Sequence, residues 1–441
     1  MQDQIKKAAA LVEAAKKAGA DKSDAVLINS RSVSVSARLG KVEKTESSES
    51  DDFTLRVFIG KRMASVSGAA ISDPTILAER AVAMAKVSPE SPTEGLADHD
   101  RLVKNPRDLD LFDPYEPDSA LLTNEAIELE ETALSVKGVT NSGGAATGYG
   151  SGRFVLATSD GFCHSYQTSR FSRSVSVVAG SGTAMERDYD YSSAIHFSDL
   201  DSIKKIGLSA GERTVKRLNA RQMKTGKINV IFDPRVARGI ASHISAMVNG
   251  ASVARKTSLL QDKMGKQIMK NNVHVTDNPL LVRGSSSRPF DGEGVEGEAL
   301  NIIENGVLSH WFLSSSVARE LGLQTNGHGV RSASSVVPSS TNFAIEAGTQ
   351  SPQDLMKDIG TGFYVNELVG HGVDFITGQY SRGASGFFIE NGEIQYAVSG
   401  VTLGSNLLHM LSHLTPANDL DRRFGTAAPT LLIEGMTLAG D

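Results

Sequence analysis

The sequence has a single cysteine, no long apolar run and no excess of positive charge. One cysteine, Cys163, among 441 residues excludes an intrachain disulfide framework. No segment approaches the roughly 18 apolar residues of a membrane span, and residues 2–19 lack the uninterrupted apolar stretch of a secretory signal. Lysine and arginine total 45 and aspartate and glutamate total 51, so the net charge is −6. These absences predict a cytoplasmic protein with neither a membrane nor a nucleic-acid partner.

The patterns that are present predict an α+β fold. Strand-like stretches of β-branched residues alternate with segments whose apolar residues recur at helical spacing. The length suits roughly two or three domains, and we place the main boundary at residues 224–226, where helical patterns give way to strands. This predicts a mixed α/β N-terminal part (1–225) and a sheet-rich C-terminal part (226–441). The expected helices are 2–19, 74–86, 119–135, 201–218, 234–249, 315–321 and about 405–414.

Three local signals predict strands and turns. Asn305-Gly306 and Asn391-Gly392 each follow an Ile-Glu pair between apolar runs, and Asn-Gly is a strong signal for a tight hairpin. The segment Gly143–Gly152 is rich in glycine and is predicted to be a turn between strands. The pentapeptide Arg-Ser-Val-Ser-Val occurs at 31–35 and again at 173–177, which by itself is weak evidence for a duplicated strand unit.

Two histidine arrangements resemble parts of a metal site. His409 and His413 stand four residues apart, as a helical zinc pair requires, but Met410 replaces the glutamate that would follow the first histidine. An amphipathic helix with buried leucines explains this segment better. His371, preceded by Asn366-Glu367, lies between two glycines after β-branched residues, which favours strand and turn over a metal helix.

Two nucleophile patterns also have simpler explanations. Ser209 lies in a Gly-x-Ser-x-Gly sequence, but apolar residues at helical spacing predict that it sits inside a helix and not at a nucleophile elbow. Cys163 stands beside His164, and in the strand predicted there the two side chains point to opposite faces. We therefore expect small packing residues around Ser209 and a structural Cys163.

Several phrases, taken in order, resemble the TldD/PmbA family, also called modulators of DNA gyrase, and within it the PmbA (TldE) branch. They are Met185-Glu186-Arg187-Asp188-Tyr189, Pro289-Phe290-Asp291-Gly292-Glu293-Gly294-Val295, 378–387 (GQYSRGASGF) and 390–396 (ENGEIQY). The resemblance implies a zinc peptidase fold. Active TldD-type members carry His-Glu-x-x-x-His on a helix and a cysteine near the C-terminus, so that two imidazoles and a thiolate hold zinc while the glutamate serves as base.

The equivalent helix of this chain lies just before Arg255 and lacks those groups. Between Pro234 and Ala254 there is one histidine, His243, and no glutamate or aspartate. The one cysteine lies far upstream. We therefore predict no catalytic residue and no metal ligand in this chain, and no cofactor of its own. Whether the chain has any enzymatic activity of its own is left open.

The resemblance implies a non-catalytic subunit of a heteromeric zinc-dependent peptidase that processes or degrades unfolded or modified peptides. A TldD-type partner would hold the zinc, and His243, Asn249 and Arg255 are the residues we expect in a substrate cleft. Whether the isolated chain forms a homodimer is left open. The alternative is a regulatory protein that acts on DNA gyrase through protein contacts, and a remote third is a hydrolase that uses His409 and His413.

Overall fold

The computed structural model describes residues 2–69, 73–332 and 335–441 and confirms the α+β class. The N-terminal helices are α1 (Gln2–Lys17), α2 (Pro74–Val87), α3 (Ser119–Leu134) and α4 (Ile203–Lys216). The N-terminal strands are β1 (Lys22–Arg38), β2 (Lys41–Ile59), β3 (Arg62–Gly68), β4 (Val139–Thr158), β5 (Cys163–Ala179) and β6 (Glu186–Ala194).

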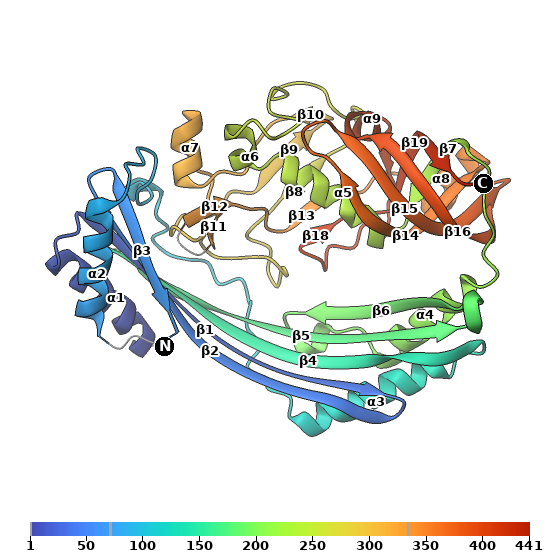
Figure 1. Cartoon of the computed structure of the whole chain (residues 1–441), viewed down its shortest axis with the longest axis horizontal. Helices are drawn as coiled ribbons and strands as arrows, with labels where there is room; N and C mark the ends of the chain where they lie inside the picture. The colour runs from blue at the N-terminus through green and yellow to red at the C-terminus, as the bar shows by residue number, and fades with distance from the viewer. Residues whose placement is uncertain (1, 70–72, 333–334) are drawn as a thin grey trace.

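These six strands form one antiparallel sheet in the order β3-β2-β1-β4-β5-β6. The sheet is long and curved, and the C-terminal part lies on its concave side (Figure 1). On the convex side, α1 and α2 cover one end with a core that includes Leu11, Leu55 and Val82. At the other end α3 and α4 pack on β4 and β5 through Leu129, Ile206 and their neighbours.

The repeated pentapeptide shows how one strand pattern builds two different faces. β1 and β5 both pair with β4, one on each side, so the two repeats run in the same direction. Val35, Val175 and Val177 are buried on the convex side. Because side chains alternate along a strand, the intervening serines of both repeats face the concave side.

The predicted turn at Gly143–Gly152 is wrong, because this segment lies inside β4 and pairs with β1 and β5. Gly148, Gly150, Gly152 and Ala146 occupy alternate positions on the concave face, opposite serines such as Ser34 and Ser172. No helix in the described part of the N-terminal half packs on this stretch, so small residues are compatible with a regular strand there. The side chains needed for burial come from the alternate positions, including Tyr149.

The C-terminal part begins with β7 (Gly226–Phe232), α5 (Pro234–Met247) and α6 (Gly250–Ala254). Its later helices are α7 (Ser315–Leu321), α8 (Pro352–Ile359) and α9 (Leu407–Ser412). Its short strands are β8 (Val275–Asp277), β9 (Leu300–Glu304), β10 (Val307–Leu308), β11 (Gly329–Ser332), β12 (Ser335–Pro338), β13 (Phe343–Ile345), β17 (Leu414–Pro416) and β18 (Thr426–Ala427). Its long strands are β14 (Gly362–Val373), β15 (Gln379–Glu390), β16 (Glu393–Asn406) and β19 (Leu431–Ala439).

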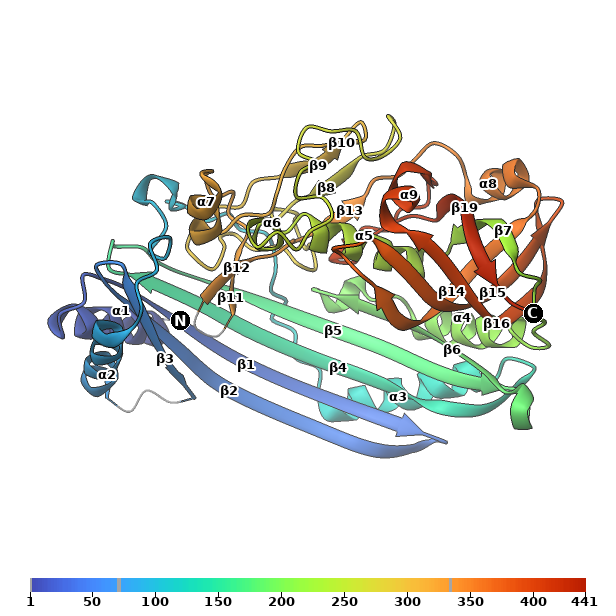
Figure 2. The ribbon, with the colours of Figure 1, turned by 45° about the horizontal axis from the view of Figure 1, so that its top comes forward.

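One C-terminal sheet has the order β16-β15-β14-β7-β19-β17, and β16 also pairs with β19, so five of its strands close into a ring. A second sheet has the order β10-β9-β8-β13-β18, and β11 pairs with β12. One large apolar core joins α5 to strands of both larger sheets. Figure 2 shows α5 within this part, near the N-terminal sheet.

Several local predictions are confirmed. Both Asn-Gly pairs have positive φ at both residues and connect β9 to β10 and β15 to β16, as a two-residue hairpin turn requires. Ser209 lies inside α4, where Gly207 and Gly211 pack against α3. Cys163 borders the convex core, while the ring of His164 lies near Phe290.

Ionic contacts join the two parts at both ends of the N-terminal sheet. At one end Arg56 and Arg331 both donate to the buried Asp24, at 2.5 and 2.9 Å. At the other end Arg235 of α5 donates to Asp188 of β6 at 2.9 Å. Within the described residues, no helix has both the length and the apolarity needed to cross a bilayer.

Candidate functional site

Helix α5 is the segment that the sequence resemblance equates with the metal helix of the zinc peptidases. Asp233 caps its first turn by accepting from the N–H of Arg235, and Pro234 occupies the first helical position. Ala237, Ile240, Ala241, Ile244 and Met247 recur at helical spacing and are buried. This face fixes the helix in the C-terminal core, so the other side is the one available for function.

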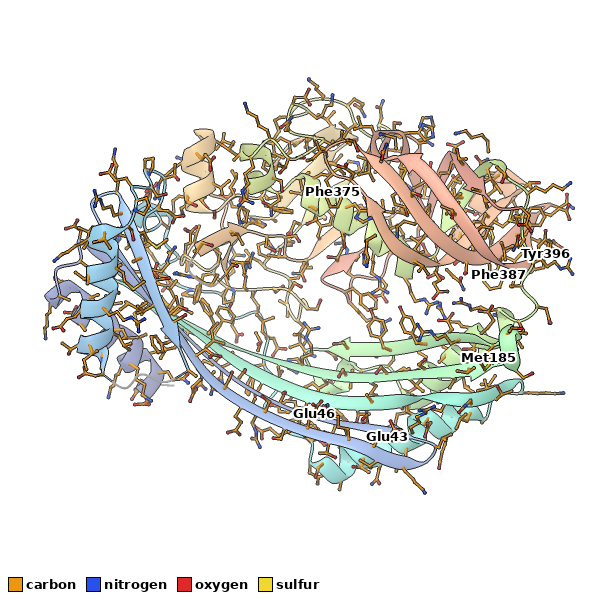
Figure 3. All side chains as sticks on the ribbon, viewed as in Figure 1. Glu43, Glu46, Met185, Phe375, Phe387 and Tyr396 are labelled. Atoms are coloured by element: carbon orange, nitrogen blue, oxygen red, sulfur yellow. The ribbon has the colours of Figure 1, made fainter. Side chains whose placement is uncertain are left out.

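His243 lies at the edge of that buried face. Its ring centroid is 5.5 Å from that of Phe375 and 6.3 Å from that of Tyr380. In Figure 3, Phe375 is labelled at the left end of the long C-terminal strands. Burial, together with the nearby charge of Arg382, lowers the pKa of His243 to about 4. The imidazole is therefore neutral near pH 7 and packed against aromatic rings.

The other two predicted cleft residues have different surroundings. Asn249 caps α6: its side chain accepts from the N–H of Ala251 and donates to the carbonyl of Pro338 at 2.7 Å. Arg255 follows α6 and is exposed. The cap gives Asn249 a structural role, and a cleft role for these three residues stays a prediction.

The residues around α5 do not fit a zinc ion. Zinc in a peptidase needs three protein ligands and a nearby base, and α5 and α6 offer one imidazole and no carboxylate. Across residues 2–69, 73–332 and 335–441, no three His, Cys, Asp or Glu side chains are arranged to hold a metal ion. Cys163 lies in β5 of the N-terminal sheet, and burial raises the pKa of its thiol.

His409 and His413 do lie together, with ring centroids 4.0 Å apart. Their nitrogens contact backbone oxygens, however. Nε2 of His409 lies 3.1 Å from the carbonyl of Glu434, and Nδ1 of His413 lies 2.9 Å from the carbonyl of His409. The pair is explained by packing and hydrogen bonding at the end of α9.

A pocket of about 560 Å³ lies between α4 and the C-terminal strands, and sequence reasoning missed it. We call it the hinge pocket; it is lined by Arg213, Lys216, Asp233, Tyr364, Asn366, Phe387, Ile394, Gln395, Tyr396 and Ala397. These residues come from segments far apart in the sequence, and no short motif joins them. Only the aromatic content of β14–β16 hinted at a surface here.

Asp233 connects the hinge pocket to α5. It accepts from the hydroxyl of Tyr364 at 2.9 Å and from the N–H of Arg235 at 2.9 Å. Burial and the charge of Asp233 raise the pKa of Tyr364, so the hydroxyl stays protonated and keeps donating. The helix that lacks zinc ligands and the pocket thus share one buried carboxylate.

Comparisons with known proteins agree with this architecture. Models of the first, central and C-terminal domains of PmbA/TldA metallopeptidases match residues 23–85, 112–218 and 225–440. The chain belongs to the PmbA/TldD family. Metalloprotease PmbA of Escherichia coli O157:H7 is 36% identical over 430 residues, which cover 95% of this chain and 92% of the relative. A Haemophilus influenzae homolog of PmbA is 35% identical, with 98% and 94% covered.

Two solved structures share the fold. A candidate modulator of DNA gyrase from Bacteroides thetaiotaomicron superposes with a TM-score of 0.91 at 25% identity and covers all of both chains. TldE from Thermococcus kodakarensis gives 0.86 at 20% identity, covering 98% of this chain and 99% of that one. Family and fold therefore agree with the sequence resemblance to the PmbA (TldE) branch.

Proposed function

We propose that this chain is a non-catalytic subunit of a heteromeric zinc-dependent peptidase that processes or degrades unfolded or modified peptides. A TldD-type partner supplies the zinc, the bound water and the catalytic base. The observation that carries this proposal is the donor set of α5 and α6: His243 is the one imidazole, and no carboxylate accompanies it. The similarity to proteins named metalloprotease PmbA supports the peptidase context.

The concave face supports a role in holding peptides. Its central stretch carries serine, glycine and alanine, with the C-terminal part on the same side (Figure 1). At one end, Phe154 and Tyr166 pack against Phe290 of the C-terminal part. Few large side chains of β1, β4 and β5 project from this central stretch, so an extended chain of varied sequence can lie against it. In this arrangement the subunit helps to form the channel that admits peptides, and the partner performs hydrolysis.

Elemental analysis of the purified chain is the first test. We expect no bound zinc in the chain alone, and peptide hydrolysis only after a TldD-type chain is added. One tightly held zinc per chain, or hydrolysis by the chain alone, would overturn the proposal. In the reconstituted complex, His243→Ala and Arg255→Ala should alter hydrolysis and leave the zinc content unchanged.

A second candidate is a regulatory protein that acts on DNA gyrase. The observation that favours it is the shared fold with the Bacteroides thetaiotaomicron protein, which is described as a candidate modulator of DNA gyrase. A pull-down of purified gyrase by this chain, without any peptidase partner, separates the two functions. Binding there, with no effect of the chain on a TldD-type peptidase, would favour the regulatory role.

A further inference from the structure

The hinge pocket combines aromatic walls with a basic rim. Tyr364, Phe387 and Tyr396 contribute rings, and Ile394 beside them is 47% exposed. Figure 3 labels Phe387 and Tyr396 at the margin of the C-terminal strands that faces the N-terminal sheet, with Met185 on the opposite side. A volume of about 560 Å³ is in the range that binds a small ligand or one or two amino-acid residues.

The positive charge at the rim is only partly neutralised by the protein. Arg217, next along α4, is held by Glu186, Asp188 and Glu367. Arg213 differs, because its nearest carboxylate oxygen, on Asp233, is 3.8 Å away and beyond hydrogen-bond distance. That carboxylate already accepts from Tyr364 and from the backbone.

Two further cations lie at the pocket rim or next to it. Lys216 is exposed at the rim. The guanidinium of Arg221 lies over the ring of Tyr396, 4.5 Å from its centroid. An anion entering here meets guanidinium and ammonium groups together, which is the arrangement that binds carboxylates.

Asn366 supplies a polar group inside the pocket. Its side chain is 9% exposed, and its oxygen is buried with no hydrogen-bond partner among the described residues. A buried amide without a partner is costly, and native proteins normally provide one. The unpaired oxygen is an acceptor, so it matches the N–H of the last peptide group of a bound chain, whereas a carboxylate has no hydrogen to donate to it.

We propose that the hinge pocket binds the C-terminal residue of a peptide that has a free carboxylate and an apolar last side chain. The carboxylate contacts Lys216 and Arg213, the last peptide group meets Asn366, and the side chain packs among the three aromatic rings. The proposal deepens the proposed function and rests on it, since a subunit that handles peptides meets chain ends. It adds that the subunit selects peptides by their last residue.

The test uses the chain alone and measures fluorescence anisotropy. The probes are two labelled hexapeptides that end in leucine, one with a free carboxylate and one with a C-terminal amide. We expect the free acid to bind about tenfold more tightly, because the neutral amide cannot form the ionic contact with the basic rim. Since that contact is ionic, the preference should shrink as salt increases.

Variants assign the preference to the pocket. Lys216→Ala should weaken binding of the free acid several-fold and leave the amide unchanged. Asn366→Leu should weaken both probes, because both carry the last peptide group. Lys204→Ala is the matched control: it removes a lysine from the same helix, about 18 Å away along its axis, and should change neither affinity.

Equal affinity for acid and amide, absence of binding to both, or equal effects of Lys216→Ala and Lys204→Ala would overturn the proposal. Those outcomes leave the subunit role intact, because that role is judged by zinc content and by hydrolysis in the reconstituted complex. Conversely, carboxylate-dependent binding with no effect of the chain on a TldD-type peptidase would remove the subunit role and keep the pocket.

Discussion

On the convex face of the N-terminal sheet, Val35, Val175 and Val177 are buried and helices cover the strands. On the concave face, residues 30–36, 146–152 and 172–176 carry serine, glycine and alanine at the alternate positions, and no helix of the N-terminal part, as far as the structure describes it, covers them. The convex face provides the apolar burial that stabilises the sheet, whereas this stretch of the concave face is polar and has small side chains. Nearer one end of the concave face, Phe154 and Tyr166 pack against Phe290 of the C-terminal part. The difference shows that one alternating strand pattern specifies both a buried core and a polar surface.

The concave face is not open throughout, and the largest expected effect of a substitution lies at the end where Arg331 of the C-terminal part contacts it. Asp24 is 1% exposed and is held by Arg56 and Arg331. Asp24→Ala leaves two buried guanidinium groups without their partner, so we expect a loss of about 3–5 kcal/mol of unfolding free energy. Urea denaturation measures this loss. The control is the exposed Asp3–Lys7 pair, where Asp3→Ala should change the unfolding free energy little.

The pH dependence of the same contact has a definite sign. Burial raises the pKa of Asp24, but the charges of Arg331 and Arg56 outweigh it and lower the pKa to about 2. Stability from this group is therefore fully present above about pH 4 and lost as pH falls toward 2. The Asp24→Ala variant should lack that part of the acid sensitivity. An unchanged acid profile would contradict the assignment.

The second prediction compares the two faces directly. Leu129 of α3 is 0% exposed in the convex core, and Ser172 is exposed on the concave face. Leu129→Ala should cost about 2–5 kcal/mol, because it removes buried methyl groups and leaves a cavity. Ser172→Ala should stay within about 0.5 kcal/mol. Similar losses for both would show that the concave face is also packed.

Sequence patterns predicted the elements better than their lengths. Apolar spacing located α3 and α7, and the Asn-Gly pairs located two hairpins, because these signals act over a few residues. The glycine-rich segment 143–152 was wrongly predicted to be a turn, since glycine marks a turn only where the chain must bend. Its strand conformation is set by pairing with β1 and β5, and those contacts are distant in sequence.

The candidate site, too, could be predicted from the sequence only in part. Missing ligands could be read directly, because a helix without glutamate or aspartate cannot supply the base whatever its register. The surroundings of His243 could not be read from the sequence, because Phe375 and Tyr380 contact it from a segment far along the chain. The hinge pocket is the extreme case: α4 and β14–β16 meet only in the folded chain.

The third prediction uses one substitution on the convex side. Gly211 of α4 packs so closely on α3 that a Cβ there would lie 2.5 Å from Cγ2 of Val136 and 3.0 Å from the carbonyl oxygen of Ala133. Gly211→Ala should therefore separate α3 from α4 and cost about 1–3 kcal/mol, despite the better helix propensity of alanine. Thermal and urea unfolding measure the change, and a stabilised variant would contradict this packing.

The same substitution on the concave face is the smallest effect and the sharpest comparison. A Cβ added to Gly150 would have its nearest neighbour, the carbonyl oxygen of Arg31, at 3.6 Å, an ordinary contact. Since Gly150 has no positive φ, alanine restricts the unfolded chain without straining the strand, and Gly150→Ala should stabilise the protein by about 0.4–1 kcal/mol. A loss comparable to that of Gly211→Ala would mean that the concave face is closely packed against another element. A gain in stability would show that the concave face is open at this position, so that an extended peptide can lie on it.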